Sequence, residues 1–457
     1  MSAADSRFEI PNNPDQTPGF TLTGVAPPES RDLDERQHET NAYGVLAYQR
    51  VIATADVQVA GFGRRSGVRF MPDHEGDLIY NGVASAADLS TRSLGGQIDG
   101  SVRLSDRHTL RGGGSMVVQR TMSDSNTWVF PVDAISGEQS SSDPILIAED
   151  QAKTGTFSGV YLQDEWKVTA IWTINAGLRW DQVDAYVRES QLSPRLNTTV
   201  EVTRSTTVHA GYARYFTPPP VEAVAPETIS KFAGTTNAAA TAQNDAARSE
   251  RAHYLDAAIT QRIHDAVQVG LDGYYKRAQH QLDDGQFGSA VIFTPFNYAE
   301  GTVYGAELTT TYQDESFLAY TNVAVSKAIG SDIESAQFNF DPDELAYIRD
   351  HEVYLDHDQR YTLSSGVSYA IIPALHIGVD ALFGSGLRKG FANEEKVPSY
   401  LTVNPNLIYV YGSFSARLDV LNVFDRSYQL RDGSGIGVGA PQYGQRRGVY
   451  GGLTYTF

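Results

Sequence analysis

The sequence contains no cysteine, which excludes disulfide bonds and thiolate metal ligands. It also lacks any run of about 18 consecutive apolar residues, so no transmembrane helix is expected. Positive charge is scarce: 36 Lys and Arg stand against 55 Asp and Glu, and the net charge of −19 argues against a nucleic-acid partner. The first residues, MSAADSRFEIPNN, have neither the basic nor the apolar region of a signal peptide, so none is expected in this chain.

Glycine and tyrosine are abundant, with 41 and 25 copies, and together with Thr and Val they suit strands and tight turns better than helix bundles. The order of the residues says more than their number. From Arg447 to Phe457 the chain reads RGVYGGLTYTF, in which bulky apolar side chains alternate with small or hydroxyl-bearing ones. This period of two is typical of a strand with one apolar and one polar face.

The same period is clear from Ala170 to Asp181, where Trp172 and Trp180 lie on the apolar face. Their separation corresponds to roughly 26 Å along a strand at about 3.3 Å per residue. A tilt of about 40° reduces this to a height of roughly 20 Å, close to the apolar band of an outer-membrane barrel with its aromatic girdles. We therefore predict an all-β fold, a transmembrane antiparallel β-barrel with hydrocarbon outside and water within.

The alternation assigns residues to the two sides of this barrel. The expected membrane girdle consists of Trp166, Trp172, Trp180, Tyr212, Tyr275 and Phe383. The expected lumen-lining residues are Asn175, Arg179, His209, Gln268, Asp272, Lys276 and Asp380.

The pattern predicts about 17 strands between residues 40 and 457, among them 107–121, 152–168 and 265–280. Short and long connections alternate along the chain. The short ones include 105–107, 264–265, 313–316 and 411–412, and the long ones lie near 67–89, 122–151, 217–248, 330–356 and 425–441. Short turns on one rim and long loops on the other are typical of transmembrane barrels. A soluble β-propeller is the alternative, but strands of more than about ten residues and the lack of a repeat of about 40 to 50 residues argue against it.

Several segments resemble the C-terminal part of TonB-dependent outer-membrane receptors. They are YLQDEWKVTAIWTINAGLRWD (Tyr161 to Asp181), SPRLNTTVEVTRSTTVHAGYARYFTPP (Ser193 to Pro219), EGTVYGAELT (Glu300 to Thr309) and DVLNVFDRSYQ (Asp419 to Gln429). In this order they cover most of residues 90 to 457. The resemblance implies a receptor that takes up a scarce ligand, of siderophore, carbohydrate or peptide class, across the outer membrane of a Gram-negative bacterium.

The sequence departs from that family at its start. The family's TonB box and globular plug domain have no counterpart here, and its barrels have about 22 strands. Aligned from the C-terminus, the predicted strands resemble strands 6 to 22, so residues 1–39 are expected to be an extracellular-loop-like segment and residues 40–457 the barrel. Because an odd number of strands cannot close, either a segment within 1–39, such as Gly19 to Val25, adds a strand, or the chain is a fragment.

The C-terminal strand resembles the signal that the outer-membrane assembly machinery recognises, through Tyr450, Gly452, Tyr455 and Phe457. The resemblance implies that machinery, outer-membrane lipid and lipopolysaccharide as partners, and the TonB complex only if a plug exists elsewhere. Two other functions stay open: a passive pore without a plug, and a surface platform or adhesin.

Acidic and histidine-containing loops suggest a metal, but their spacing fits no known site. Asp341, Asp343 and Glu344 are oxygen ligands suited to Ca²⁺, and His351 with His357 would suit a transition metal, yet a solvated acidic loop is the preferred interpretation. The glycine-rich GSGIGVG at Gly433 to Gly439 lacks the Lys-Ser/Thr of a phosphate-binding loop. We expect no enzyme activity, metal or cofactor.

Overall fold

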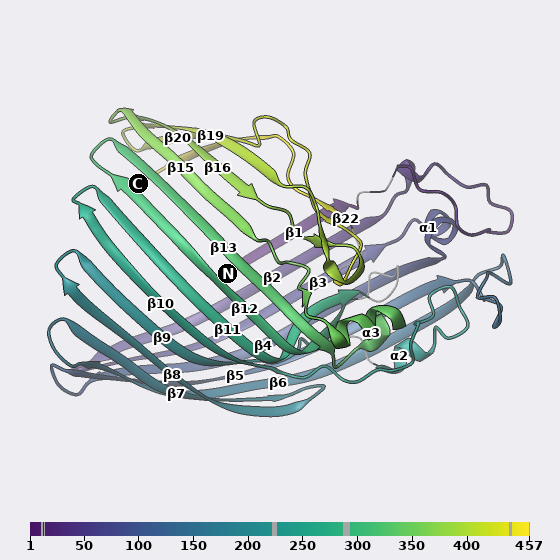
Figure 1. The fold of residues 1–457 in the computed structure, drawn as a ribbon, viewed down its shortest axis with the longest axis horizontal. Coiled ribbons are helices and arrows are strands. Elements are labelled where there is room, and N and C mark those ends of the chain that lie inside the picture. The colour runs from purple at the N-terminus through teal and green to yellow at the C-terminus, as the bar shows by residue number, and fades with distance from the viewer. Residues whose placement is uncertain (11, 13, 222–225, 287–292, 438–440, 457) are drawn as a thin grey trace.

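A computed structural model describes residues 1–10, 12, 14–221, 226–286, 293–437 and 441–456 (Figure 1). One large antiparallel sheet of 19 strands dominates the fold. Its long strands, in chain order, are β1 (Ser2–Glu9), β2 (Arg36–Ile52), β3 (Ala55–Met71), β4 (Val83–Arg103), β5 (His108–Val129), β6 (Ile145–Lys167), β7 (Trp172–Asp184), β8 (Arg188–Thr203), β9 (Thr206–Thr217), β10 (Glu250–His264), β11 (Val267–Gln286), β12 (Phe293–Gln313), β13 (Phe317–Ile333), β15 (Tyr361–Ile372), β16 (Leu375–Gly384), β19 (Tyr400–Tyr411), β20 (Phe414–Leu421) and β23 (Gly448–Tyr455).

The remaining elements are short and lie at one end of the sheet. The strands are β14 (Val353–Tyr354), β17 (Arg388–Lys389), β18 (Glu395–Lys396), β21 (Gln429–Asp432) and β22 (Pro441–Tyr443). The helices are α1 (His74–Asn81), α2 (Pro226–Ser230) and α3 (Pro342–Asp350), with 3₁₀ turns at Ser30–Asp32, Gln337–Asn339 and Phe391–Asn393. None of the helices in the described ranges has the length and apolarity needed to cross a bilayer.

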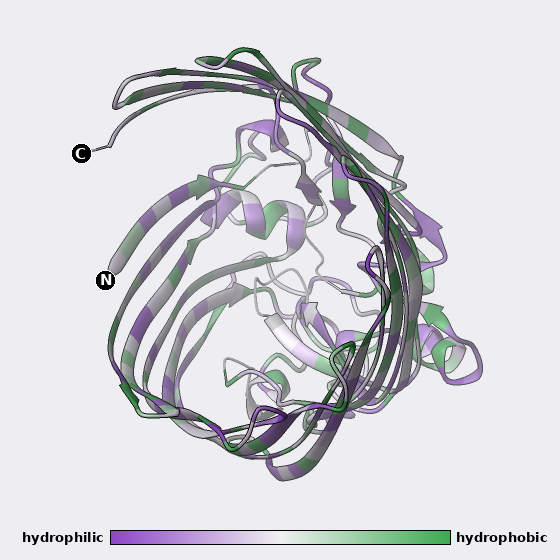
Figure 2. Ribbon diagram, turned by 90° about the vertical axis from the view of Figure 1, so that its left-hand side faces the viewer, coloured by the Kyte–Doolittle hydropathy of each residue, from purple (hydrophilic) through white to green (hydrophobic). Residues whose placement is uncertain are grey.

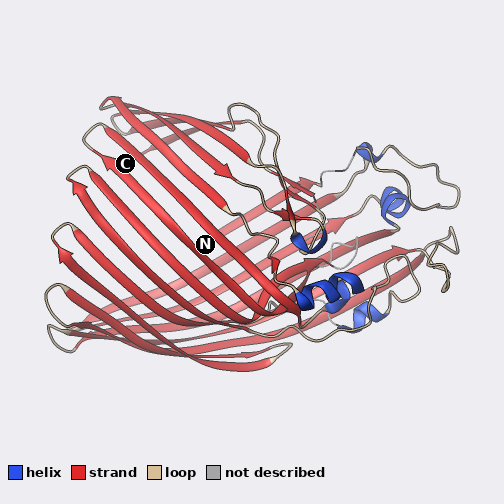
Figure 3. Cartoon of the chain, viewed as in Figure 1, coloured by secondary structure: helices blue, strands red, loops and turns tan. Residues whose placement is uncertain are grey.

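Each long strand pairs with the next one along the chain, so the sheet curls into a barrel-like wall (Figures 1 and 2). Hairpin turns of a few residues lie together on one rim, and the helices and most of the long connections lie on the other (Figure 3). The two edge strands are β1 and β23, and among the described residues no pairing joins one to the other. The all-β prediction, with its segregated turns and loops, is confirmed.

The N-terminal segment differs from the expectation. Residues 1–39 were predicted to form a loop, but Ser2–Glu9 forms β1, which pairs with β2 from Ser2 opposite Tyr43 to Glu9 opposite Arg36. Gly19 to Val25, the alternative strand candidate, is not a strand. The stretch SAADSRFE has one large apolar side chain, Phe8, so it gives no alternating signal. A segment within 1–39 thus adds a strand, as one alternative predicted, although it is Ser2–Glu9 and not Gly19 to Val25. Without the two-residue β14, the wall described has 18 strands, one more than predicted.

The strands extend further toward the long-loop rim than the alternation predicts. The strand predicted at 107–121 continues to Val129 as β5, the one at 152–168 begins at Ile145 as β6, and the one at 265–280 continues to Gln286 as β11. The connections are correspondingly shorter, and the one between β7 and β8 is only residues 185–187. Long and short connections therefore do not alternate as strictly as predicted.

The long connections pack against each other instead of extending into solvent. At the long-loop rim an apolar core, which we call the mouth core, contains Val83, Val129, Ile229, Phe232, Phe296, Tyr298, Ala328, Ile333, Ala336, Phe338, Phe340, Ile348, Val353, Leu355, Ala392 and Ile436. It joins the outer ends of four strands to α3 and to the segments before and after it. The expectation of a solvated acidic loop is thus wrong for Asp356 and Asp358, which are buried, whereas Asp341, Asp343 and His351 are exposed.

Candidate functional site

The inner, concave face of the sheet is identified by hydrogen bonds that reach across a whole strand. Tyr161 Oη on β6 donates to Asp99 Oδ1 on β4 over a distance of 2.9 Å, and Gly113 on β5 lies between them in the register. A Cβ at Gly113 would lie 2.6 Å from Asp99 Oδ1, so this contact requires glycine. Side chains converge in this way on the concave side of a curved sheet. We call the face that carries Tyr161 the inner face.

All seven predicted lumen residues lie on the inner face. Following the pairing register from strand to strand connects Tyr161 to Arg179 directly and to the other candidates in turn. Asn175 is opposite Asn197, and Gln268 is opposite Thr311. The register therefore places these seven side chains on one common face, and their role in lining a water-filled lumen stays a prediction.

The charged members of this set are paired with neighbours. Arg179 Nε lies 2.7 Å from Asp181 Oδ1, and Lys276 Nζ lies 2.6 Å from Glu250 Oε1. Asp380 Oδ1 accepts a hydrogen bond of 2.9 Å from Tyr320 Oη across Gly366 on β15. The inner face is therefore a network of polar contacts and is not a row of isolated charges.

His209 is the centre of a small acidic cluster on the same face. Its Nε2 lies 3.0 Å from Asp256 Oδ2 on β10 and 3.7 Å from Asp272 Oδ2 on β11. Ala258 occupies the intervening position on β10, so a small side chain again allows contact across a strand. All three side chains are partly exposed, which places them at the surface of the interior.

The opposite, outer face carries all six residues proposed for the membrane girdle, whose contact with a membrane stays a prediction. Trp166, Trp172, Trp180 and Tyr275 are each about two-fifths exposed, with values between 39% and 43%. Tyr212 and Phe383 are half-buried on the same face, where Tyr212 pairs with Leu196 and Leu255. Large apolar side chains exposed along a whole sheet face are unusual for a protein surrounded by water.

The last strand has the predicted alternation. Tyr455 pairs with Phe414 on the outer face, while Tyr450 pairs with Asp419 and Gly452 with Arg417 on the inner face. Phe457, the fourth residue of the predicted assembly signal, lies outside the described residues.

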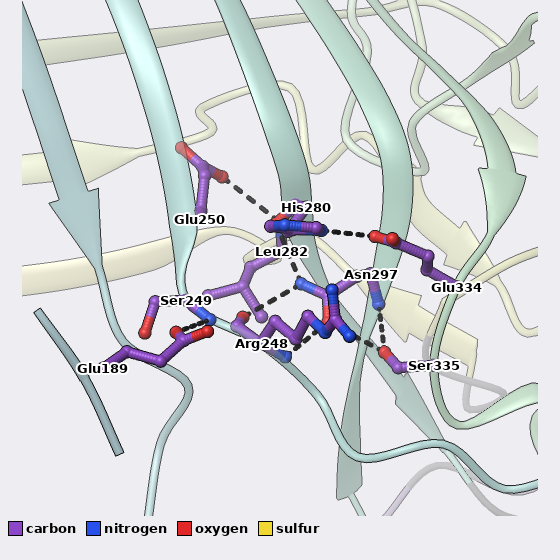
Figure 4. A network of polar contacts seen from close by, with 9 residues as sticks. All are labelled: Glu189, Arg248, Ser249, Glu250, His280, Leu282, Asn297, Glu334 and Ser335. Atoms are coloured by element: carbon purple, nitrogen blue, oxygen red, sulfur yellow. Dashed lines mark hydrogen bonds and ion pairs between the residues drawn. The ribbon is translucent and has the colours of Figure 1, made fainter. Parts of the chain in front are cut away.

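Near the long-loop rim a buried polar network fixes the loops to the strand ends (Figure 4). Its centre is Asn297 on β12, whose side chain is fully buried. The Nδ2 group donates to the carbonyls of His280 (2.8 Å) and Arg248 (3.1 Å), and Oδ1 accepts from the Arg248 amide (2.7 Å) and Ser335 Oγ (2.8 Å). His280 has a φ of 52° and has no partner in the pairing register, so its carbonyl is free to bind Asn297. The left-handed backbone at His280 and the buried side-chain amide of Asn297 thus stabilise each other.

The network continues along the strand ends. His280 Nδ1 contacts Glu334, the Leu282 amide donates to Glu250 Oε2 (3.2 Å), and the Ser249 amide donates to Glu189 Oε2 (2.9 Å) (Figure 4). Carboxylates of two strands therefore hold backbone amides of the neighbouring segments. Composition and periodicity did not reveal this network, because its members are far apart in the sequence and no alternation marks them.

Beside this network, two carboxylates and a histidine come together from distant segments. Asp283 lies on the outer extension of β11, and Asp356 and His357 lie between β14 and β15. His357 Nδ1 is 2.8 Å from Asp356 Oδ1 and 3.8 Å from Asp283 Oδ1. Both carboxylates are buried, with 7% and 8% of the side chains exposed, while His357 is 54% exposed.

The titration behaviour of this cluster follows from its burial. Desolvation raises the pKa of Asp283 to about 7, although His357 opposes the shift. The hydrogen bond to Asp356 raises the pKa of His357 above its usual value. Burial also raises the pKa of the Tyr298 phenol, with the charges of Asp283 and Asp356 acting in the same direction.

The metal candidates considered from the sequence are not brought together. Glu344 Oε1 accepts the Ala392 amide (3.0 Å), and Asp341 precedes α3. His351 stacks on Tyr347 with ring centroids 4.2 Å apart, and within the described ranges no metal-ligand group contains it. His357 is instead grouped with Asp283 and Asp356.

Comparisons with known proteins agree with this architecture. The sequence profile of the family described as TonB dependent receptor-like, beta-barrel matches residues 5–423. The fold is similar to the siderophore receptor PiuA from Acinetobacter baumannii, with 14% identity, a TM-score of 0.66, and coverage of 93% of this chain and 65% of that one. It is also similar to the ferric yersiniabactin uptake receptor FyuA from Yersinia pestis, with 12% identity, a TM-score of 0.71, and coverage of 100% and 67%.

The ferric citrate transporter FecA gives 15% identity, a TM-score of 0.64, and coverage of 92% of this chain and 62% of that one. No curated protein sequence matches this chain. The chain spans about two thirds of the length of the solved receptors, and sequence identities this low indicate a shared fold only.

Proposed function

The chain belongs to the TonB-dependent receptor-like β-barrel family, and from this premise we propose that it forms the wall and mouth of an outer-membrane receptor that imports a scarce ligand. TonB-dependent receptor barrels are outer-membrane proteins that act as receptors and transporters. The observation that carries the proposal is a sheet with a polar, ion-paired inner face, an outer face rich in exposed aromatic and aliphatic side chains, and loops gathered on one rim.

In this proposal the outer face contacts lipid and lipopolysaccharide. Side chains such as Leu178, Leu255 and Leu271, each 50% to 52% exposed, then lie in hydrocarbon, where burial of apolar area is favourable. The C-terminal strand, through Tyr450, Gly452, Tyr455 and Phe457, is recognised by the assembly machinery during insertion.

The inner face provides the path for the ligand. His209, Asp256 and Asp272 form an acidic patch on the wall, and the ion pairs of Arg179 and Lys276 present both charges to the interior. Such a surface favours a polar ligand that exchanges water for protein hydrogen bonds. Chelated metal ions are one such class, since the solved relatives include a siderophore receptor and a ferric citrate transporter; carbohydrates and peptides are the others.

The mouth core gives the receptor a preformed entrance. Because the long loops are held by buried residues such as Phe296, Phe338 and Leu355, a ligand meets an ordered surface, which lowers the entropy cost of binding. Energy from TonB requires a plug domain inside the barrel, so coupling to TonB is part of the proposal only with such a plug.

Uptake measurements test the proposal. Cells that carry the gene, cells without it and cells without functional TonB are compared for accumulation of a labelled ferric siderophore, an oligosaccharide and a peptide. Accumulation of one ligand that needs both the gene and TonB supports the receptor. Equal accumulation in all three strains for every ligand contradicts it.

A passive pore is the second candidate, and the features that favour it are the polar inner face, with its acidic cluster around His209, and the acidic sequence. The net charge of −19 then predicts preference for cations. Steady single-channel openings of the purified protein in planar bilayers, with a cation-selective reversal potential, would identify a pore. A receptor with a blocked interior would show no channel openings, and neither would a surface platform. The uptake comparison separates these two, because only the receptor accumulates a ligand.

A further inference from the structure

The cluster of Asp283, Asp356 and His357 remains after the inner face and the mouth core have been explained. Its three side chains come from two segments that lie side by side only in the folded chain, and each offers one ligand atom within 4.8 Å of the others. The ligand path proposed along the inner face does not use them, since they lie at the long-loop rim among the packed connections.

Two buried oxygen atoms at this place have no hydrogen-bond partner among the residues that the structure describes. They are Asp283 Oδ2 and Tyr298 Oη, and the Tyr298 side chain is completely buried. Leaving a buried carboxylate oxygen unpaired costs about 1–3 kcal/mol or more, so such atoms are rare in stable proteins. Asp283 Oδ1 is satisfied by the Asp284 amide (3.0 Å), which leaves Oδ2 available for a further partner.

Negative charge at the cluster is only partly balanced. Arg431 lies 2.8 Å from Asp356 Oδ2 and neutralises that carboxylate from one side. Within the described part of the chain, Asp283 has His357 as its only ion-pair partner, at 3.8 Å. A bound cation would therefore stabilise the buried Asp283 carboxylate, because a buried charge is unfavourable unless it is paired.

We propose that Asp283, Asp356 and His357 bind a divalent transition-metal ion, with Zn²⁺ as the representative probe, and that this ion fastens β11 to the segment between β14 and β15. Two carboxylate oxygens and one imidazole nitrogen fit a tetrahedral ion that keeps one open position. Ca²⁺ is excluded as the preferred ion because it takes 6–8 oxygen ligands, more than the cluster offers.

The geometry is close to that of a metal site. Ligand atoms of a tetrahedral ion at about 2.0 Å lie about 3.3 Å from one another. The observed separations from His357 Nδ1 are 2.8 Å to Asp356 Oδ1 and 3.8 Å to Asp283 Oδ1, which lie on either side of this value; the unpartnered Asp283 Oδ2 belongs to the same carboxylate. Binding replaces the proton on Nδ1, and side-chain shifts draw the three ligand atoms, which lie within 4.8 Å of one another, to coordination distance.

The surroundings supply the outer contacts that metal ligands require. Arg431 keeps its bond to Asp356 Oδ2 and orients that carboxylate while Oδ1 faces the ion. Gly437, within the glycine-rich stretch that has no phosphate-binding role, has a φ of 121°, and a Cβ there would lie 2.6 Å from Asp356 Oδ2. Glycine at this position thus allows the backbone to cover the buried carboxylate. The proposed metal site does not depend on which ligand the receptor imports, so it goes beyond the proposed function.

Isothermal titration of the full-length protein, purified in detergent and stripped with EDTA, tests the site with ZnCl₂ alone. We expect one Zn²⁺ per chain, and at least a tenfold loss of affinity in Asp283→Asn and in His357→Gln. His351→Gln is the matched control for a nearby surface histidine, and His209→Gln is the control for the cluster on the inner face; both should bind as the wild type does.

A spectroscopic readout separates loss of the site from loss of the fold. Co²⁺ should give visible d–d absorption bands of tetrahedral intensity in the wild type, and these bands should disappear in His357→Gln. Since His357 pairs with two buried carboxylates, the thermal unfolding of the metal-free variant is compared with that of the metal-free wild type. A variant that is still folded at the temperature of the titration attributes the lost bands to the site. Unchanged Zn²⁺ affinity in His357→Gln, or loss of binding only in His209→Gln, would overturn the proposal. Failure of ligand uptake with an intact Zn²⁺ site would overturn the receptor function and leave this site standing.

Discussion

Replacing Asn297 with alanine should loosen the mouth while leaving the wall of the barrel intact. The wild-type side chain makes four hydrogen bonds, to His280, to Ser335 and two to the backbone of Arg248, and it is fully buried. At about 1 kcal/mol of net stability for each bond, the loss is about 4 kcal/mol of local free energy. The unpaired amide and carbonyl groups of Arg248 and His280 raise this cost further.

Hydrogen–deuterium exchange measured by mass spectrometry is the direct assay. Since about 1.4 kcal/mol corresponds to a factor of ten, amides in residues 243–250 and 279–284 should exchange about a thousandfold faster in the variant. Asn175→Ala is the control, because Asn175 is a half-buried residue of the wall. Exchange in residues 172–181 should be unchanged by either substitution. A change of less than tenfold at the mouth, or a uniform increase over the whole barrel, would refute the reasoning.

Two further predictions concern buried charges at the same rim. Burial, followed by the neighbouring Glu35, raises the pKa of Asp77 in α1 to about 9. The folded segment therefore keeps a proton that the carboxyl of the unfolded chain releases above about pH 4. The free energy of unfolding near α1 should fall by about 4 kcal/mol from pH 4 to pH 7 and should continue to fall toward pH 9. Asp77→Asn should weaken this trend, and burial of Glu35, whose pKa is also raised, accounts for what is left. The readout is the ratio of variant to wild-type proteolysis within 72–82 at each pH, and an equal pH trend in both proteins would contradict the prediction. Arg388→Met should destabilise the mouth by about 3–5 kcal/mol, because Arg388 contacts the fully buried Asp358 carboxylate at 2.8 Å and lies 3.4 Å above the Tyr354 ring. The loss should appear as a lower temperature of loop unfolding. Arg417→Met removes one partner of an exposed ion pair and should change the free energy of unfolding by less than about 1 kcal/mol.

Much of the wall could be predicted because its strands meet two different environments. Trp172, Leu178 and Trp180 alternate with Asn175 and Arg179, and the structure places the two sets on opposite faces of β7. The alternation stops where the strands pass beyond the apolar band, since both faces are then polar or packed against loops. This is why β5 and β11 are longer than predicted and why β1, with Phe8 as its one large apolar residue, was missed.

The mouth could not be predicted from local patterns. Asp283 and His357 meet through tertiary packing alone, and Asn297 joins segments that lie far apart in the chain. One feature of the sequence is nevertheless consistent with packing of this connection. Residues 330–356 contain Phe338, Phe340 and Ile348 among the polar residues, and these apolar side chains are all buried in the mouth core. The polar composition predicts a solvated loop, and the large apolar residues that would have indicated packing were not used in that prediction.

Cysteine scanning along β7 would show directly whether the sheet separates hydrocarbon from water, and it is simple because the chain has no native cysteine. Single cysteines at residues 174 to 179, in the full-length protein in outer membranes, are reacted with a charged, water-soluble maleimide and with a lipid-soluble one. We predict that 175, 177 and 179 react with the water-soluble reagent and that 174, 176 and 178 react only with the lipid-soluble one. Equal labelling of both sets by the water-soluble reagent would contradict a sheet that separates hydrocarbon from water.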